Sequence, residues 1–391
     1  MTETFETENE FGKGTVISWA SLLDANCREQ AEAISRVPIL EGHLALMPDA
    51  HFGFGPPVGS ALLTRDAVMP YAVGVDIGCG MMALQTDLDR RQFTSPGRLL
   101  GRIRQLIPAG VGKAQLIESS AAEAFIEEFG LPYGIEMLKP GAEATARNQF
   151  GTLGSGNHFV EVCEDAPEDG RVWLLLHSGS RGIGNQLATA HVRIAQELCK
   201  TPLESREFAF VERGTPAFDA YIADMLWCQN YAYHQRQAMM AALMQAVWEE
   251  VGSFEIVQEI NCHHNYAEEL EPGLWLTRKG AIDASEGRMG IIPGSMGAAT
   301  YIVRGKGNPM SYNTSPHGAG RLMGRNVARK TLDLAAFKEQ MAGRTWMDRE
   351  AQQLLDEAPN AYKPIGQVIE DSFNLIEPVT ILHQFINYKG L

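Results

Sequence analysis

The sequence predicts an α+β fold, with mixed β-sheets flanked by helices, in one compact domain over residues 1–391. Three observations support this prediction. Short β-branched and glycine-rich runs alternate with longer stretches that have helical periodicity. Hydrophobic residues make up 45% and charged residues 21% of the chain, which is typical of a globular protein with a sizeable core. No low-complexity linker and no internal repeat divides the chain, although its length alone would allow two or three domains.

The sequence predicts both strands and helices between residues 14 and 130. A strand is expected over residues 14–19, and a helix rich in Ala, Glu and Gln over 24–36. Residues 46–82 alternate glycine, proline and short β-branched runs, which is typical of strands joined by tight turns. A first helical excursion follows at about 98–130.

Strands and glycine-rich turns return in the middle of the chain. A glycine-rich turn feeds an apolar strand over residues 151–162, and a strand over 171–176 leads into a loop over 177–185. Residues 279–325 are again rich in glycine. A last helix-and-strand unit continues to residue 391.

Residues 215–251 form the second helical excursion and the clearest helix of the sequence. Thr215 suits the N-cap and Pro216 the first turn. Apolar residues then recur at helical spacing: Phe218, Tyr221, Ile222, Met225 and Trp227. We interpret the methionines on this helix as core residues rather than as a binding groove: Met225, Met239, Met240 and Met244.

Composition also limits the class of protein. The net charge of −15 argues against indiscriminate coating of nucleic acid but leaves room for a local basic patch. No apolar run approaches the length of a membrane helix, and the acidic N-terminus does not resemble a signal peptide. The six cysteines form no CxxC pair, so we expect a cytoplasmic protein with reduced thiols.

Several common catalytic motifs are absent from the sequence. There is no GxxxxGK[ST] phosphate loop, no GxSxG nucleophile elbow and no HExxH zinc motif. No lysine stands in the K-x-D-G setting of ligases that carry a nucleotide on lysine. Any nucleotide chemistry must therefore use other groups.

Four short segments combine glycine with aspartate, cysteine or histidine, at residues 75–80, 154–159, 177–182 and 261–265. Carboxylate, thiolate and imidazole together suit a borderline divalent cation, and a thiolate can bridge two such ions. Each histidine alone is more often an ordinary core or surface residue, and most cysteines are buried apolar residues. The residues therefore indicate a metal site without establishing it.

A fifth segment, residues 313–321, places His317 just before a turn of small residues and two arginines, Arg321 and Arg325. Histidine can act as a covalent nucleophile, and arginines bind phosphate. A loop histidine beside solvated arginines is the alternative.

In this order, the five segments resemble the RtcB family of RNA-splicing and RNA-repair ligases. The resemblance extends to residues 47–51, 151–154, 293–297 and 388–390, and it covers the chain from about residue 15 to the end. It implies an RtcB-like domain with a deep cleft that binds two Mn²⁺ ions and GTP. One ion would be held by Cys79, His158 and His177, and the other by Asp76, Cys79 and His264, whereas His263 would be structural.

The resemblance also implies the residues of the reaction. His317 would be the nucleophile that accepts GMP. Glu161 would accept hydrogen bonds from guanine, Tyr362 would stack on it and Lys389 would contact the base. The remaining positions that match guanylate, phosphate or RNA contacts are Asp49, Asn157, His158, Phe159, Arg181, His264, Asn265, Lys279, Pro293, Gly294, Ser295, Met296, Thr300, Gly318, Ala319, Gly320, Arg321 and Arg325.

The implied activity joins RNA ends bearing a 2′,3′-cyclic phosphate or 3′-phosphate to 5′-hydroxyl ends, in transfer-RNA splicing or RNA repair. Transfer or ribosomal RNA and an archease-type activator are the implied partners. Two departures concern substrate preference: Pro316 precedes the nucleophile and restricts Ser315 to extended geometry, and Thr300 replaces a usual serine. A phosphodiesterase that only heals ends, and an RNA-binding module with a vestigial site, are the alternatives.

Overall fold

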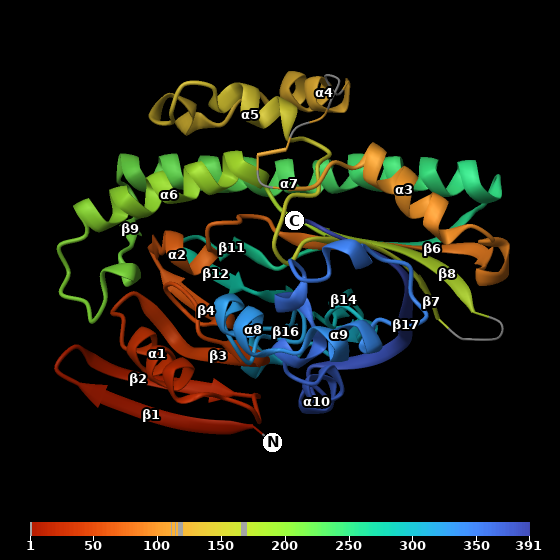
Figure 1. Ribbon diagram of the computed structural model, residues 1–391. Helices are drawn as coiled ribbons and strands as arrows, with labels where there is room; N and C mark the ends of the chain where they lie inside the picture. The colour runs from red at the N-terminus through yellow and green to blue at the C-terminus, as the bar shows by residue number, and fades with distance from the viewer. Residues whose placement is uncertain (1, 111, 114, 116–119, 166–169) are drawn as a thin grey trace.

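Two large sheets organise the chain, as seen in a computed structural model that describes residues 2–110, 112, 113, 115, 120–165 and 170–391 (Figure 1). Both are antiparallel except where β2 pairs with β3. The six-stranded sheet has the order β1 (Glu3–Asn9), β2 (Gly12–Ser18), β3 (Leu40–His51), β4 (Val58–Arg65), β12 (Leu274–Lys279) and β11 (Asn265–Glu271). The seven-stranded sheet has the order β10 (Ile256–His263), β6 (Gly80–Asp89), β8 (Arg171–Ser178), β7 (Phe159–Glu164), β17 (Ile376–Lys389), β15 (Thr300–Gly305) and β14 (Met289–Pro293).

Two short strand pairs complete the β-structure: β13 (Ala281–Asp283) with β16 (Thr314–Pro316), and β5 (Ala67–Val68) with β9 (Val211–Glu212). The α-helices of the described residues are α1 (Ala25–Ser35), α2 (Pro70–Val73), α3 (Pro96–Leu106), α4 (Ser120–Phe129), α5 (Ala142–Asn148), α6 (Arg181–Leu198), α7 (Pro216–Val251), α8 (Arg325–Thr331), α9 (Leu334–Gln340) and α10 (Ile365–Asp371). The expected α+β class is confirmed.

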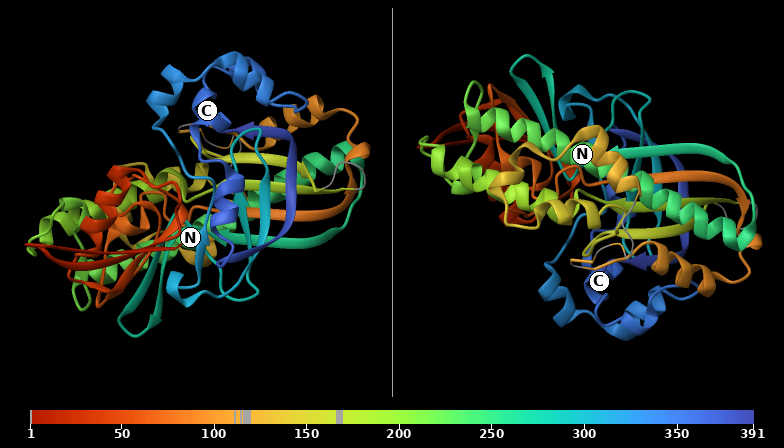
Figure 2. Two further views of the ribbon diagram at one scale, coloured as in Figure 1. Left: turned by 90° about the horizontal axis from the view of Figure 1, so that it is seen from below. Right: turned by 90° about the horizontal axis from the view of Figure 1, so that it is seen from above.

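The long helix α7 runs across the molecule on one side of the sheets, with α6 and α3 beside it and α4 and α5 beyond (Figure 1). The helices α8, α9 and α10 lie on the other side of the sheets (Figures 1 and 2). The buried apolar face of α7 packs on β6 and β8 through residues such as Met239, Met240 and Leu243. Within the described part of the chain, none of the helices has the length and apolar character needed to cross a bilayer.

Local signals account for the elements that the sequence predicts well. The Asp24 carboxylate accepts a hydrogen bond from the Cys27 amide at 3.0 Å and so caps α1. The Thr215 hydroxyl caps α7 in the same way, through the Phe218 amide at 3.2 Å. Gly252 ends α7 with a positive φ of 86°. The methionines of α7 are buried or packed against the core, as expected.

Some predicted elements differ from the structure. The loop expected over 177–185 is wrong: β8 continues to Ser178, and α6 begins at Arg181, whose φ is +58°. Gly182 and Gly184 weaken the helical signal there. The excursion over 98–130 contains two helices, α3 and α4, and its residues 111, 114 and 116–119 lie outside the described residues. The acidic strand β1 was not expected either; it forms a charged outer edge of its sheet.

Candidate metal centre and nucleotide site

Four strands of the seven-stranded sheet, β6, β7, β8 and β10, each have one terminus at the same edge of the sheet, and this brings residues that are distant in sequence together. In their register, Gly80 of β6 lies opposite Ser178 of β8 and His263 of β10, and His177 lies opposite Phe159 of β7. Cys79, His158 and His264 are the immediate neighbours of those strand ends. The chain passes directly from β10 through His264 into β11 of the other sheet, so this edge lies at the junction between the two sheets.

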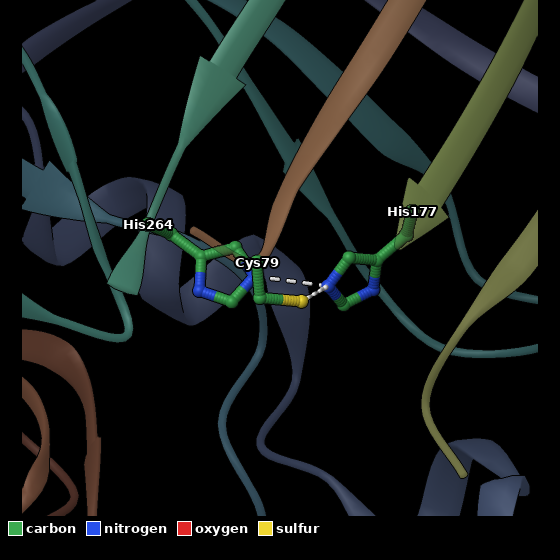
Figure 3. A group of neighbouring side chains, drawn as sticks. All are labelled: Cys79, His177 and His264. Atoms are coloured by element: carbon green, nitrogen blue, oxygen red, sulfur yellow. Dashed lines mark hydrogen bonds between the residues drawn. The ribbon is translucent and has the colours of Figure 1, made fainter. Parts of the chain in front are cut away.

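The five expected metal ligands converge at this edge. The Cys79 Sγ lies 3.2 Å from the His177 Nε2 and 3.4 Å from the His158 Nε2. The His177 Nε2 lies 2.9 Å from the His264 Nε2, so the thiol and two imidazoles point toward one another (Figure 3). The Asp76 Oδ2 lies 3.0 Å from the His158 Nε2.

The donor atoms form two overlapping groups that share Cys79. One group is Asp76, Cys79 and His158, and the other is Cys79, His177 and His264; within each, the donor atoms lie within 4.8 Å of one another. The sharing agrees with the expected bridging role of the thiolate. The resemblance divides the histidines differently, because it pairs His158 with His177 and places His264 with Asp76. Which donors hold which ion therefore stays a prediction.

Outer hydrogen bonds orient two of the imidazoles. The His158 Nδ1 donates to the Leu153 carbonyl oxygen at 2.9 Å, which leaves Nε2 directed at the side chains of Cys79 and Asp76. The His264 Nδ1 lies 3.3 Å from the Asn265 Oδ1. That oxygen also accepts a hydrogen bond from the Gly280 amide at 2.8 Å, which fixes it as an acceptor.

The electrostatics of the cluster suit a divalent cation. Burial lowers the pKa of His177 and of His264 well below the usual range, so both imidazoles are neutral ligands. Burial raises the pKa of the Cys79 thiol, and the Asp76 charge adds to that effect. Burial also opposes ionisation of Asp76, but the hydrogen bond and charge of His158 outweigh it and lower the Asp76 pKa to about 2. A cluster of sulfur, nitrogen and oxygen donors fits Mn²⁺, Zn²⁺ or Co²⁺.

His317 lies beside this cluster, directly after β16. Its ring centroid is 4.5 Å from that of His264. Its Nδ1 lies 2.8 Å from the Oδ2 of Asp49, a carboxylate that is fully buried. The same Oδ2 accepts hydrogen bonds from the backbone amides of His317 and Gly318 at 3.2 and 3.3 Å. Because a carboxylate only accepts, the proton resides on Nδ1, and Nε2 keeps a free lone pair.

A cavity of about 360 Å³ joins the metal cluster to His317. Most residues that the sequence assigns to metal, nucleotide, phosphate or RNA contacts line it. These are Asp76, Asn157, Phe159, His177, His264, Asn265, Lys279, Pro293, Gly294, Ser295, His317, Gly318, Ala319, Gly320, Arg321, Arg325, Tyr362 and Lys389.

The other predicted site residues lie behind the cavity wall. Cys79, His158, Glu161, Met296 and Thr300 are each less than 5% exposed, and Asp49 is completely buried. Arg181 does not line the cavity: its Nε lies 3.3 Å from the Thr152 hydroxyl, and its guanidinium lies against Gly154. Pro316 lies opposite Ala281 in β16, and Ser315 has the extended backbone that the following proline requires.

Glu161 is a buried carboxylate whose partner comes from β17. Its Oε1 accepts a hydrogen bond from the Asn387 Nδ2 at 2.6 Å. Burial raises the pKa of Glu161 to about 7, although Lys389 and Asn387 act in the opposite direction. The side chain is thus close to its midpoint at neutral pH.

Glu357 is a site residue that the sequence analysis missed. It lines the cavity at 2% exposure and contacts three cations. Its Oε1 lies 2.5 Å from both the Arg321 Nη2 and the Arg325 Nη1, and its Oε2 lies 2.8 Å from the Lys389 Nζ. The Tyr362 hydroxyl donates to the same Oε2 at 2.9 Å. Nothing in its local sequence, a single helical turn ending at Glu357, indicates this contact.

Together, fold and site define a protein with a cysteine–histidine–aspartate cluster suited to divalent cations, next to a histidine that has a free nucleophilic nitrogen. Comparison with known proteins gives the family. The family model described as tRNA-splicing ligase RtcB matches residues 30–390.

Comparison with individual proteins gives the same family. The chain is 38% identical to RNA-splicing ligase RtcB1 of one Escherichia coli strain, over 94% of this chain and 95% of that protein. It is 37% identical to RNA-splicing ligase RtcB of E. coli K12 over the same shares. It is 30% identical to tRNA-splicing ligase RtcB of Pyrobaculum aerophilum, over 88% of this chain and 86% of that protein. The chain belongs to the RtcB family of RNA ligases.

Proposed function

We propose that this protein is a GTP- and Mn²⁺-dependent RNA ligase. It joins RNA ends that carry a 2′,3′-cyclic phosphate or a 3′-phosphate to 5′-hydroxyl ends, through guanylated His317. The observation that carries the proposal is the position of His317: its Nδ1 proton is held by buried Asp49, its Nε2 is free, and it lies beside the Cys79–histidine cluster in one cavity.

The residues of the cluster divide into ligands and supports. Asp76, Cys79, His158, His177 and His264 would hold the two ions, with Cys79 as the bridge. Bound Mn²⁺ would supply Lewis-acid neutralisation of phosphate charge. Leu153 and Asn265 orient His158 and His264, and removal of such outer partners typically weakens metal binding about 10- to 100-fold.

In the first step, the His317 Nε2 attacks the α-phosphorus of GTP. The new N–P bond forms as the bond to the bridging oxygen breaks, and pyrophosphate leaves. The proton on Nδ1 remains in its hydrogen bond with Asp49, which stabilises the positive charge that develops on the imidazole. Glu161, in its ionised form, would accept from guanine N1–H and N2–H₂ and so favour guanine over adenine.

The later steps use the RNA ends. Water opens a cyclic phosphate by adding to phosphorus as the P–O2′ bond breaks, which leaves a 3′-phosphate. An oxygen of that phosphate attacks the guanylate phosphorus, and the N–P bond to His317 breaks to give RNA(3′)pp(5′)G. The 5′-hydroxyl then attacks the 3′-phosphorus, and GMP leaves. Lys279, Arg321 and Arg325 offer positive charge along the cavity for these phosphates, and Lys389 would contact the guanine base.

Three further features belong to the same proposal. We infer that residues 1–391 act as one catalytic domain, that the enzyme works in the cytoplasm on transfer or ribosomal RNA, and that an archease-type protein is a candidate activator. The retention of His317 favours a ligase over an end-healing phosphodiesterase. The retention of all five metal ligands argues against a vestigial RNA-binding module.

Incubation of the purified protein with Mn²⁺ and α-labelled GTP tests the proposal. Acid-labile, alkali-stable label is expected on the wild-type chain and not on His317→Ala. The phosphodiesterase alternative takes first place if the wild-type protein binds Mn²⁺, opens cyclic phosphates and remains unlabelled.

A further inference from the structure

Two aromatic side chains form part of the rim of the cavity. Phe54, in the loop between β3 and β4, is 72% exposed although it lines the cavity. Tyr71, in α2, lines the same cavity. The two rings are nearly parallel, at an interplanar angle of 21° and a centroid distance of 6.4 Å. We refer to Phe54 and Tyr71 as the aromatic rim.

The loop that carries Phe54 is held in place from several directions. The Gln30 Oε1 accepts a hydrogen bond from the Gly53 amide at 3.2 Å, and its Nε2 donates to the Gly55 carbonyl at 2.6 Å. The Glu207 Oε2 accepts from the Gly55 amide at 2.6 Å. Gly55 has a φ of +71°, and a Cβ there would lie 2.8 Å from the Tyr71 Cβ, so glycine is required for this close approach. The exposed position of Phe54 is therefore built into the fold.

Lys279 fixes the two parts of the rim to each other. Its buried ammonium donates to the Phe54 carbonyl oxygen, and to the Tyr71 carbonyl oxygen at 3.0 Å. The next residue, Gly280, abuts the nucleophile, since a Cβ there would lie 3.1 Å from the His317 Cε1. The rim is thus connected through one short stretch of chain to the reacting histidine.

We propose that the aromatic rim is a stacking platform for an unpaired nucleobase of the RNA, next to the end that reacts. Phe54 presents a largely exposed aromatic face at the cavity, next to the ring of Tyr71. RNA-binding proteins use such rings to stack splayed bases, whereas charged groups bind the phosphates. Here the cations lie on the cavity walls, at Lys279, Arg321, Arg325 and Lys389. This inference rests on the proposed ligase function and adds a base-binding subsite to it.

Substitution of Phe54 separates this subsite from the chemistry on GTP. Phe54→Ala is expected to raise the KM for RNA in sealing about 5- to 150-fold, the usual cost of one stacked base. Phe54→Trp and Phe54→Tyr should restore it, whereas Phe54→Leu should not. Guanylation of His317 should stay within about twofold of wild type in all four variants. Phe373→Ala removes a ring that is 64% exposed and does not line the cavity, and it should leave the KM unchanged.

RNA substrates with one abasic nucleotide identify the base. An abasic site at the stacked position, at either the 3′-phosphate or the 5′-hydroxyl terminus, should weaken wild-type sealing as much as Phe54→Ala does. On that substrate, Phe54→Ala should have no further effect. The same loss from Phe54→Ala on every abasic substrate would overturn the inference, as would a loss of guanylation. A wild-type chain that is never guanylated would instead refute the proposed function itself.

Discussion

The Oδ2 of Asp49 lies 2.8 Å from the Nδ1 of His317 and also accepts from the amides of His317 and Gly318. One carboxylate oxygen therefore fixes the ring, the tautomer and the backbone of the candidate nucleophile together. The backbone on both sides of Asp49 is held by Lys363. Its ammonium donates to the carbonyl oxygens of Pro48 and Ala50 at 3.0 and 2.7 Å. Lys363 thus places a buried positive charge close to the carboxylate.

Asp49→Asn should abolish guanylation while the fold is retained. An amide at this position can donate to Nδ1 and so favour the tautomer with its proton on Nε2, which is then no longer a nucleophile. In a comparable histidine–aspartate pair this change costs about 10⁴-fold in rate. Labelling with GTP measures the effect, and thermal unfolding checks the fold. Asp371→Asn, which alters a buried carboxylate paired with Ser21, is the control and should keep full labelling.

GTP binding should strengthen as the pH rises through about 7, the pKa to which burial raises Glu161. Only the ionised carboxylate accepts both guanine donors. Equilibrium dialysis between pH 6 and 8 measures this, and Glu161→Gln should flatten the difference between GTP and ATP. An unchanged preference for GTP in Glu161→Gln would show that another group reads the base.

The raised pKa of Glu161 also makes the free energy of unfolding depend on pH. Because the folded-state pKa of Glu161 is above the ordinary 4.5, the native state binds more protons than the unfolded state between pH 4.5 and 7. The contribution of Glu161 to the free energy of unfolding therefore falls as the pH rises through this window. Denaturation of wild type and Glu161→Gln across that range should show that the free energy of unfolding of the wild type falls relative to that of the variant as the pH rises.

Glu357→Gln should destabilise the protein by about 3–5 kcal/mol at pH 7, because it leaves Arg321, Arg325 and Lys389 without their shared carboxylate. Burial opposes ionisation of Glu357, but the three cations outweigh it and lower its pKa to about 2. The stabilisation is present in full above pH 4.5 and is lost as the pH falls toward 2. Urea unfolding at several pH values measures it. Glu377→Gln, at an exposed pair with Arg304, should change stability by less than about 1 kcal/mol.

Arg236→Met should both destabilise the fold and weaken the stabilisation by Mn²⁺. Arg236 is a completely buried cation of α7, and it donates to the Gly78 carbonyl at 2.9 Å and the Ser178 carbonyl at 3.1 Å. Each carbonyl belongs to a residue next to a predicted metal ligand, Cys79 or His177. Loss of Arg236 removes both hydrogen bonds, at about 1–3 kcal/mol for each buried acceptor left unpaired. The Gly78 carbonyl keeps a contact with the His263 Nδ1 at 2.8 Å.

The control for this prediction is Met240→Ala, which leaves a cavity in the hydrophobic core on which the same helix packs. It should lower the unfolding temperature but keep the full increase that Mn²⁺ produces. If Arg236→Met retains that increase as well, Arg236 supports the helix alone.

The sequence predicted the fold class, the cap of α7 and, through the family resemblance, the convergence of the metal ligands. These predictions succeed for different reasons. Caps and periodicity are local, so Thr215 reveals the start of α7 directly. The metal ligands are distant in sequence, and only the ordered set of motifs around them indicated that they meet. The register of β6, β7, β8 and β10 supplies the physical cause.

The residues that the sequence analysis missed owe their roles to tertiary contacts. Glu357, Lys363 and Arg236 are charged residues in ordinary helical or loop sequence, and such residues are usually solvated. Their roles come from tertiary contacts with partners far along the chain, such as Lys389 or Gly78. The aromatic rim had a weak local signal, since glycines flank Phe54 directly after residues 47–51.

The measurement that tests the central claim most directly is the joining of two labelled RNA halves, one with a 2′,3′-cyclic phosphate and one with a 5′-hydroxyl. The account predicts a sealed product that requires both GTP and Mn²⁺ and is lost in His317→Ala and in Cys79→Ala. Opening of the cyclic phosphate by wild type with Mn²⁺ and GTP, without any sealed RNA, would contradict it. Sealing by His317→Ala at the wild-type rate would contradict it equally.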